Sequence, residues 1–258
     1  MCGRYSLTAP PEDVRALFGY GERPNFPPRY NIAPTQPIAV VTGEADGRHF
    51  LLARWGLLPS WVKDPKDFPL LVTARSETAA QKPAFRAAMR HRRCLVPANG
   101  FYEWGPGAGT RKQPYWCAPK DGHLVAFAGL METYTDPNGS ELDTATILTT
   151  PANRRLRPIH DRMPAVILPE DFAAWLDTVG VSAEEATKML RPADDRLFEP
   201  VPVSLAVNRV ANDRPELQER IAPPAPEPGV EPIAAEVPPR RGRGKEKTKK
   251  DDGQIDLF

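Results

Sequence analysis

A change in composition near residue 222 sets the limits on what this chain can fold into. Before it, apolar runs alternate with turn residues, as in a globular domain. After it the chain reads APPAPEPGVEPIAAEVPP, then RRGRGKEKTKK, then DDGQIDLF. Proline cannot donate to a β-ladder or continue a helix, and a run of like charges repels itself. We therefore expect one folded domain over residues 1–221 and a disordered tail over residues 222–258.

Short apolar runs between turn residues predict that strands outnumber helices in the folded part. Residues 37–43 and 49–55 flank the turn sequence EADGR and predict a hairpin, and residues 114–119 are expected to pair with 123–130 across KDG. The irregular order of strands and helices argues against a doubly wound sheet, so we expect an α+β domain with curved, mainly antiparallel sheets. Two further runs are typical of buried strands: residues 144–150 and 164–169. Helices are predicted at residues 10–18, 82–91, 169–178 and 182–191.

Composition and cysteine usage exclude several classes of function. The chain has 258 residues, 41% of them hydrophobic, and a net charge of +1, so any nucleic-acid binding must come from locally clustered arginines. The three cysteines form no CxxC pair and no zinc spacing with the four histidines, so we expect neither a metal nor a cofactor. Cys94 and Cys117 are expected to be buried. No apolar stretch is long enough for a bilayer and no signal peptide is seen, which predicts a cytoplasmic protein.

The third cysteine, Cys2, directly follows the initiator methionine. Removal of Met1 by an aminopeptidase would make Cys2 the mature N-terminus, with an α-amine and a thiol on adjacent carbons. Reference pKa values are about 8 for the amine and about 8.5 for the thiol, so neutral amine and some thiolate coexist near pH 7. Such a pair can act as an N-terminal nucleophile, or condense with an aldehyde to an imine and then a thiazolidine. The alternative is a small residue that occurs there by chance.

The sequence NGFYEWG places Glu103 between aromatic residues. Successive side chains of a strand point to opposite faces, so Glu103 would share a face with Phe101 and Gly105 and be partly desolvated. A desolvated carboxylate has a raised pKa and can transfer protons. The alternative is an acid whose hydrogen bonds are satisfied at a strand edge.

The segment PANRRLRPIHDRMP concentrates polar groups between two prolines. His160 within it is a natural proton carrier near neutral pH. The arginines around it, Arg162 among them, suit phosphate oxygens. The alternative is a solvated loop with an incidental histidine.

A second basic cluster lies in the predicted helix 82–91 and just after it. Arg86 and Arg90 fall on one face of that helix and Arg93 lies near it, which predicts either a track for a nucleic-acid backbone or a solvated helix face. Aromatic residues and prolines near arginines can stack on unpaired bases or wedge between them, although they are more often core residues. The candidates for such contacts are Asn31, Pro34, Trp55 and Trp61.

Seven motifs of this chain occur in the order found in one protein family: MCGRY, RYNIAPT, WGLLPSW, ARSET, RRCLVPANGFYEW, IHDRMP and VNRVAND. Over residues 2–221 the chain therefore resembles the SOS-response-associated peptidase family, which is also described as a family of abasic-site processing proteins. The resemblance implies a protein of the DNA damage response, which we expect to be monomeric and nucleoid-associated. It further implies a β-barrel-like core with peripheral helices and a positively charged surface for single-stranded DNA.

The resemblance also implies a chemistry. Cys2 is expected to react with the ring-opened aldehyde of an abasic site in single-stranded DNA, giving a thiazolidine crosslink that shields the lesion from strand cleavage. Glu103 and His160 match the family's acid/base pair, which would assist Met1 removal, crosslink formation and lyase-type reversal. Residues matching the family's phosphate contacts are Arg4, Arg75 and Arg162, and those matching its apolar contacts near the DNA kink are Pro34 and Trp61.

One position departs from the family pattern, which usually has asparagine where this chain has Thr73. A hydroxyl offers fewer hydrogen bonds than an amide on a longer side chain, so Thr73 is a weaker candidate for the catalytic site. Two other functions fit the same motifs. The first is a thiol peptidase of N-terminal-nucleophile type, acting on itself or on other proteins. The second is a noncovalent single-strand-binding protein in which Cys2 is incidental.

The last five residues, QIDLF, resemble the pentapeptide with which bacterial proteins bind the sliding clamp. That motif reads Gln, an aliphatic residue, Ser or Asp, Leu, then Phe, and residues 254–258 fit every position. Leu257 and Phe258 would bury their side chains in an apolar pocket of the clamp, and Gln254 would supply orienting hydrogen bonds. The alternative is an arbitrary hydrophobic end.

Overall fold

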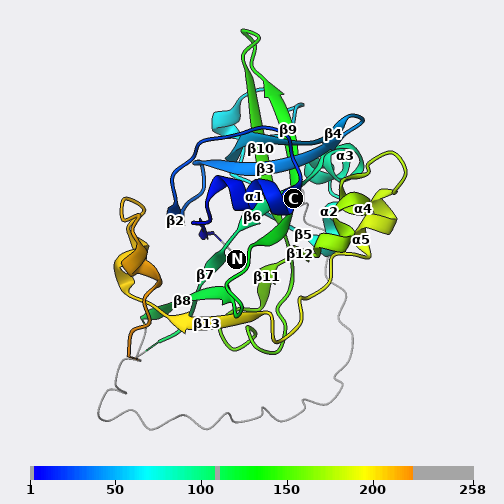
Figure 1. Cartoon of the computed structure of the whole chain (residues 1–258). Helices are drawn as coiled ribbons and strands as arrows, with labels where there is room; N and C mark the ends of the chain where they lie inside the picture. Colours follow the sequence, from blue (N-terminus) through cyan, green and yellow to red (C-terminus); the bar gives the residue numbers. More distant parts are fainter. Residues whose placement is uncertain (1–2, 108–110, 223–258) are drawn as a thin grey trace, which may run out of the picture. The chain divides into compact units, whose positions relative to one another are not determined.

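The computed structural model describes residues 3–107 and 111–222, so Cys2 and residues 254–258 lie outside the described residues. Within these ranges the chain forms thirteen strands and five α-helices, arranged as two sheets with helices at the periphery (Figure 1). The prediction of an α+β domain with more strands than helices is confirmed. The predicted disordered tail, residues 222–258, lies outside this description apart from its first residue.

Five strands close into a barrel at the centre of the domain. In sheet order β4, β3, β6 and β9 pair antiparallel, β9 pairs antiparallel with β10, and β10 closes the ring by pairing parallel with β4. Apolar side chains of these strands, such as Trp55, Leu95 and Ile147, are fully buried. The strands are β3 (Pro37–Glu44), β4 (Gly47–Trp55), β6 (Arg93–Ala98), β9 (Val125–Thr135) and β10 (Glu141–Pro151).

Two predicted features of this barrel are confirmed. The hairpin over residues 37–55 forms, with β3 and β4 in register from Pro37 opposite Arg54 to Glu44 opposite Gly47. The run 144–150 is the buried part of β10. Three short strands extend the barrel sheet: β5 (Thr73–Arg75), β11 (Arg162–Pro164) and β12 (Val166–Ile167).

A second sheet of five strands is connected to the barrel through β6 and β7. Its strands, in order, are β13 (Phe198–Pro202), β8 (Lys112–Pro119), β7 (Gly100–Pro106), β1 (Tyr5–Leu7) and β2 (Arg29–Ile32). The pairing predicted between residues 114–119 and 123–130 is wrong. Strand β8 pairs with β7 and β13, whereas β9 already has β6, β10 and β12 as neighbours. The KDG turn therefore connects two sheets, with Gly122 at φ 73°.

Gly100 lies where the chain passes from the barrel into the second sheet. A Cβ atom there would lie 2.7 Å from the carbonyl oxygen of Cys117 and 2.9 Å from Nε1 of Trp116. Only glycine permits this approach. The approach seats β7 against β8 and so determines the position of the residues that follow Gly100.

The helices gather mainly on one side of the strands, where α2 to α5 lie on the right of Figure 1. The predicted helices 10–18 and 82–91 are confirmed to within one residue, whereas 169–178 and 182–191 are shorter than predicted. The carboxylate of Asp177 accepts the N–H groups of Val179 and Gly180, and this turn ends α4. The helices are α1 (Pro11–Phe18), α2 (Ser76–Ala79), α3 (Pro83–His91), α4 (Phe172–Leu176) and α5 (Ala183–Thr187).

Arg93 is a structural residue and not part of a surface track, which corrects the sequence-based grouping with Arg86 and Arg90. It is 2% exposed, and its guanidinium donates to the carbonyl oxygens of Met89 and of three residues in and after α4. These bonds attach the α4–α5 region to the barrel.

Replacing Arg93 with methionine is therefore expected to lower the free energy of unfolding by about 3 kcal/mol or more, because several buried carbonyl groups lose a charged donor. The matched variant Arg86→Met, on the exposed face of α3, should change it by less than about 0.5 kcal/mol. Urea unfolding measures both values. Equal stability of the two variants would show that the Arg93 bonds contribute nothing net.

Candidate functional site

Glu103 lies on β7 with the alternation that the sequence predicts. Phe101 on one face belongs to the main core, and Tyr102 on the other packs with Val203 and Val207 in a separate small core. Glu103 is 4% exposed, and burial raises its pKa to about 7. At neutral pH both the protonated and the ionised form of this carboxyl group are therefore populated. A group that both donates and accepts protons needs both forms.

The loop that carries His160 packs directly against β7. A Cβ atom on Gly105 would lie 3.0 Å from Cγ2 of Ile159 and 3.2 Å from its Cα, so glycine at this position lets the loop approach. The negative charge of Asp161 also contributes to the raised pKa of Glu103, after the larger effect of burial. Two segments that are far apart in the sequence therefore form one site.

The end of β10 brings two more segments to this loop. Strand β5 pairs parallel with β10, with Arg75 opposite Thr149. Strand β11 pairs antiparallel with the same part of β10, with Thr149 opposite Pro164. The candidates Thr73 and Arg75 on β5 and Arg162 on β11 therefore flank one short stretch of β10.

His160 is partly buried, with 24% of its side chain exposed. Burial lowers the pKa of its imidazole below the usual 6.5, so the ring is mainly neutral at pH 7. The backbone N–H of Arg162 donates to Nδ1 over 3.0 Å, and an oxygen of Asp161 lies 3.0 Å from the same nitrogen. A neutral imidazole can take part in acid–base catalysis, and the loop that carries it packs against β7, the strand of Glu103.

Arg162 forms an ion pair that the sequence analysis did not predict. Its guanidinium donates to both carboxylate oxygens of Glu77, over 2.5 and 2.9 Å, and to the carbonyl oxygen of Thr149. The Arg162 side chain is only 11% exposed. A DNA phosphate at this guanidinium would therefore compete with Glu77, which lies 85 residues earlier in the chain.

Arg4 and Asn31 are held by the segment that contains the VNRVAND motif. Arg4 donates to Oδ1 of Asn31 over 2.7 Å and to the carbonyl oxygens of Val207 and Asn208. Asn31 is fully buried, and its amide donates to three carbonyl oxygens of residues 207–212. We expected Asn31 to contact DNA directly, but its side chain is buried and does not face solvent. Asn31 instead positions Arg4 and residues 207–212.

The other predicted DNA contacts lie outside this cluster. Trp61 is 58% exposed and packs edge-on against Phe68, with 5.5 Å between the ring centroids. Pro34 is half-buried in the β2–β3 connection, and Arg86 is exposed on α3.

The described N-terminal residues run alongside Glu103. Strand β1 pairs antiparallel with β7, with Tyr5 opposite Phe101, and the N–H of Tyr102 donates to the carbonyl oxygen of Arg4 over 2.9 Å. This register brings Gly3, the first described residue, to the level of Glu103.

Comparison with known proteins identifies the family. The family model described as SOS response associated peptidase (SRAP) matches residues 1–210. The chain belongs to the SRAP family. The resemblance seen in the seven motifs is thereby confirmed.

Relatives of this SRAP-family chain cover almost all of the folded domain. This chain is 36% identical over 222 residues to the abasic site processing protein YoqW of Bacillus subtilis, and the match covers 85% of this chain and 99% of YoqW. It is 31% identical over 261 residues to the abasic site processing protein HMCES of Xenopus tropicalis, covering 84% and 77% of the two chains. A solved structure of a protein from Bacteroides thetaiotaomicron matches with a TM-score of 0.78 at 26% identity, covering 86% and 100%. The predicted barrel core is thereby confirmed.

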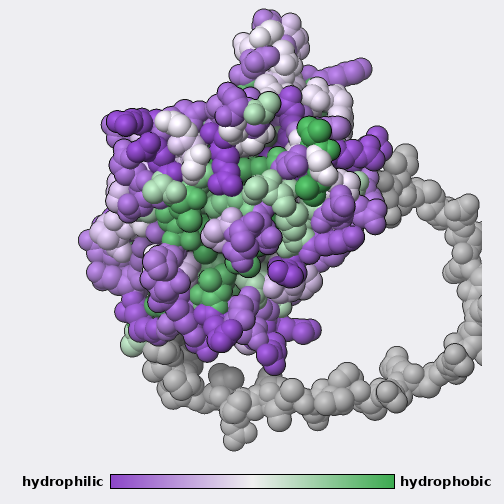
Figure 2. All heavy atoms as spheres, turned by 45° about the vertical axis from the view of Figure 1, so that its right-hand side comes forward, coloured by the Kyte–Doolittle hydropathy of each residue, from purple (hydrophilic) through white to green (hydrophobic). Residues whose placement is uncertain are grey.

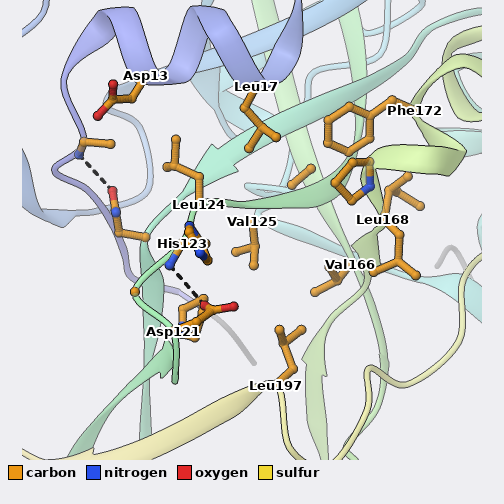
Figure 3. A pocket seen from close by; sticks show the side chains of 17 residues that line it. Asp13, Leu17, Asp121, His123, Leu124, Val125, Val166, Leu168, Phe172 and Leu197 are labelled. Carbon is orange, nitrogen blue, oxygen red and sulfur yellow. Dashed lines mark hydrogen bonds between the residues drawn. The ribbon is translucent and has the colours of Figure 1, made fainter.

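A hollow elsewhere on this SRAP-family domain is apolar. Figure 2 shows hydrophobic surface framed by hydrophilic residues on the side where the helices lie. A pocket of about 540 Å³ lies between α1, β12 and the start of β9, and Leu17, Val166 and Phe172 are among its lining residues (Figure 3). None of the predicted site residues lines it, so the acid–base cluster and this pocket are separate features.

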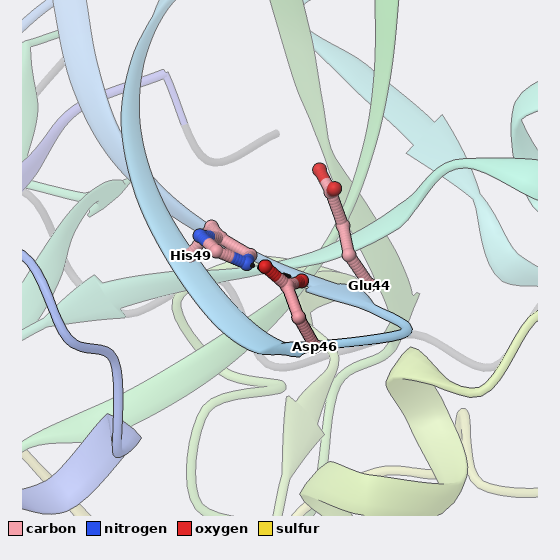
Figure 4. Close-up of side chains that lie close together, drawn as sticks. All are labelled: Glu44, Asp46 and His49. Carbon is pink, nitrogen blue, oxygen red and sulfur yellow. Dashed lines mark hydrogen bonds and ion pairs between the residues drawn. The ribbon is translucent and has the colours of Figure 1, made fainter.

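Three side chains at the β3–β4 turn have the types and spacing of a metal site (Figure 4): Glu44, Asp46 and His49. Both ring nitrogens of His49 face carboxylates, with Asp46 at 2.8 Å and Glu22 at 2.8 Å. Hydrogen bonds to these two acids raise the pKa of His49 to about 9. At neutral pH the ring therefore carries protons on both nitrogens and forms ion pairs with the two acids. A doubly protonated ring has no lone pair to offer a metal.

Among the described residues, none of the helices has the length and apolar composition that a membrane span requires.

Proposed function

We propose that this protein captures abasic sites in single-stranded DNA by forming a covalent thiazolidine link at Cys2 after Met1 has been removed. The link shields the lesion from strand cleavage. The name of the relatives YoqW and HMCES, abasic site processing protein, supports the choice of substrate.

One observation carries the proposal: β1 leads the N-terminal residues alongside the buried, half-ionised carboxyl group of Glu103. An N-terminal cysteine needs such a group, because condensation with an aldehyde moves protons in both directions. Cys2 itself lies outside the described residues, so its placement there is part of the proposal.

The chemistry balances without a further reactant. The α-amine of Cys2 attacks the aldehyde carbon, and the carbinolamine loses one water to give an imine. The thiolate then attacks the imine carbon, and the nitrogen takes a proton to complete the five-membered ring. Glu103 as an acid protonates the departing hydroxyl group, and as a carboxylate it accepts a proton from the ammonium group. His160 serves as a second proton carrier.

A denaturing gel tests the proposal. Mature protein incubated with an oligonucleotide that carries one abasic site should give a band that resists denaturation. A tetrahydrofuran analogue, which lacks the aldehyde, should give none. Binding of both DNAs without a resistant band would favour the noncovalent single-strand-binding protein.

The peptidase alternative uses the same three residues, Cys2, Glu103 and His160, and differs in substrate. In our proposal peptidase activity is limited to removal of Met1, and the lyase-type step is reversal of the crosslink. Cleavage of unrelated peptides by protein that does not crosslink abasic DNA would favour the alternative.

Arg75 offers a sharp test of how DNA is bound, because it is exposed beside the cluster. Arg75→Ala should weaken binding to single strands and reduce the slope of log affinity against log salt by about one unit. The control Arg196→Ala, whose guanidinium pairs with Asp194, should leave the slope unchanged. Identical slopes for both variants would move the DNA path away from β5, and Arg86 on α3 would be the next residue to test.

Residues 254–258 remain a proposed clamp-binding motif. A fluorescent peptide of residues 249–258 is expected to bind a bacterial sliding clamp, because Leu257 and Phe258 each gain roughly 1.5–3 kcal/mol on burial. The matched peptide with Leu257→Ala and Phe258→Ala should bind more than about a hundredfold more weakly. Indistinguishable fluorescence anisotropy titrations of the two peptides would contradict the motif.

A further inference from the structure

Nδ1 of His160 lies between two groups of opposite hydrogen-bonding character. The backbone N–H of Arg162, 3.0 Å away, can only donate. The carboxylate of Asp161, also 3.0 Å away, can only accept. A ring nitrogen cannot satisfy both groups at once, so each group favours a different position of the proton on the ring.

The Arg162 N–H favours the form in which Nδ1 is bare and the proton is on Nε2. The Asp161 carboxylate favours the forms in which Nδ1 carries a proton, including the doubly protonated ring. In the first form Nε2 can only donate a proton. In the neutral form favoured by Asp161, Nε2 has a lone pair and can accept one.

We propose that Asp161 is a positioning residue which, together with the backbone N–H of Arg162, lets Nε2 of His160 act in turn as proton acceptor and proton donor. This inference rests on the proposed function, in which His160 moves protons. With Nδ1–H held by Asp161, Nε2 takes a proton from the reacting amine, and the ring becomes an imidazolium paired with Asp161. Nε2 then gives that proton to the nitrogen when the thiolate closes the thiazolidine ring, which restores the starting state.

The surroundings of the ring support this assignment. Burial has the largest effect on the imidazole and lowers its pKa, and the charge of Lys112 on β8 lowers it further, whereas Asp161, the acid in contact with the ring, raises it. Glu103 on β7 is the other acid of the site, and its pKa also responds to Asp161. The guanidinium of Arg162 faces Glu77. Asp161 thus acts on both proton carriers of the site.

The backbone around His160 is fixed independently of the Asp161 side chain. The N–H of Ala152 donates to the carbonyl oxygen of Asp161 over 2.8 Å, and the N–H of His160 donates to that of Leu156 over 3.0 Å. The Asp161 side chain is 86% exposed and can be replaced without opening a cavity. A variant at this position therefore tests the carboxylate and not the fold.

The experiment measures ring protonation and reaction rate separately, in the full-length protein. Two-dimensional ¹⁵N spectra of the histidine rings, assigned with His160→Ala, report the tautomer and pKa of His160 without any DNA. Single-turnover crosslinking to abasic single-stranded DNA reports the rate across pH. The variants are Asp161→Ala and Asp161→Asn, and Asp121→Ala removes an exposed carboxylate on another part of the surface as a control.

Asp161→Ala should shift neutral His160 to the Nε2–H tautomer and lower the pKa of the ring. It should also slow crosslinking by about tenfold while DNA affinity stays unchanged. This loss of rate is smaller than that expected for removing a whole acid–base group, because the contact between Asp161 and His160 is exposed to solvent. Asp161→Asn keeps an acceptor oxygen and should recover most of the rate, to within about threefold of the wild type. The Asp121→Ala control should change neither property.

Unchanged tautomers in Asp161→Ala would overturn the inference, as would a slowed reaction that Asp161→Asn does not recover. Failure of the proposed function is distinguishable, because the wild-type protein would then form no crosslink while the ring spectra still responded to Asp161→Ala.

Discussion

Replacing Cys2 with alanine is expected to abolish the denaturation-resistant adduct with abasic single-stranded DNA, while noncovalent binding of the DNA persists. The thiazolidine needs sulfur and nitrogen on adjacent carbons, and alanine removes the sulfur. Cys2→Ser should be nearly as inactive, because a hydroxyl is a much poorer nucleophile than a thiolate. In both variants the α-amine can still form an imine, so borohydride should trap an adduct that is otherwise lost.

The matched control for Cys2 is another thiol of the same chain. Cys94 is fully buried, and burial raises the pKa of its thiol far above the usual value, so it cannot supply a thiolate. Cys94→Ala should therefore crosslink at the wild-type rate. Full activity of Cys2→Ala would contradict the proposed chemistry, whatever the behaviour of Cys94→Ala.

Replacing Glu103 with glutamine should slow crosslinking by about a hundredfold to ten-thousandfold near pH 7, because the amide keeps the shape and removes the titrating group. DNA affinity should stay within about twofold. Glu132 provides the matched control, since it is also buried with a raised pKa but lies on β9 in the barrel. Glu132→Gln should leave the rate unchanged. Equal losses of rate and affinity in Glu103→Gln would make Glu103 a structural residue.

The raised pKa of Glu103 also predicts how stability depends on pH. Burial raises the pKa to about 7 in the folded chain from the usual 4.5, so between these values the folded state binds more protons than the unfolded state. Stability contributed by the protonated group is therefore complete below pH 4.5 and is lost as pH rises through about 7. Glu103→Gln removes that loss, so the variant should gain stability relative to the wild type, by at most about 3 kcal/mol, between pH 5 and pH 8.

Much of the fold follows from local sequence. Alternation and turn residues predict the β3–β4 hairpin, and the same alternation predicts which face of β7 carries Glu103. The KDG turn is misleading because a short turn has the same sequence whether it connects strands of one sheet or of two. Likewise helical spacing places Arg93 near the face of Arg86 and Arg90. In the structure Arg93 is instead the first residue of β6, and its packing against α4 makes it a buried residue.

The site itself depends on pairings that no local pattern encodes. The parallel pairing of β5 with β10 brings Arg75 beside the segment of Arg162, and the ion pair of Arg162 with Glu77 joins residues 85 positions apart. The opposed contacts to Nδ1 of His160 depend on the exact path of the backbone at β11. Sequence reasoning could name these residues individually, but only the tertiary structure shows which of them act on one another.

Mass spectrometry of the purified adduct tests the central claim most directly. Our account predicts an intact mass equal to the protein without Met1 plus the oligonucleotide minus one water, formed without borohydride. After digestion with protease and nuclease, the sugar remnant should map to the peptide that begins at Cys2. An adduct on any other residue, or on chains that retain Met1, would contradict the account.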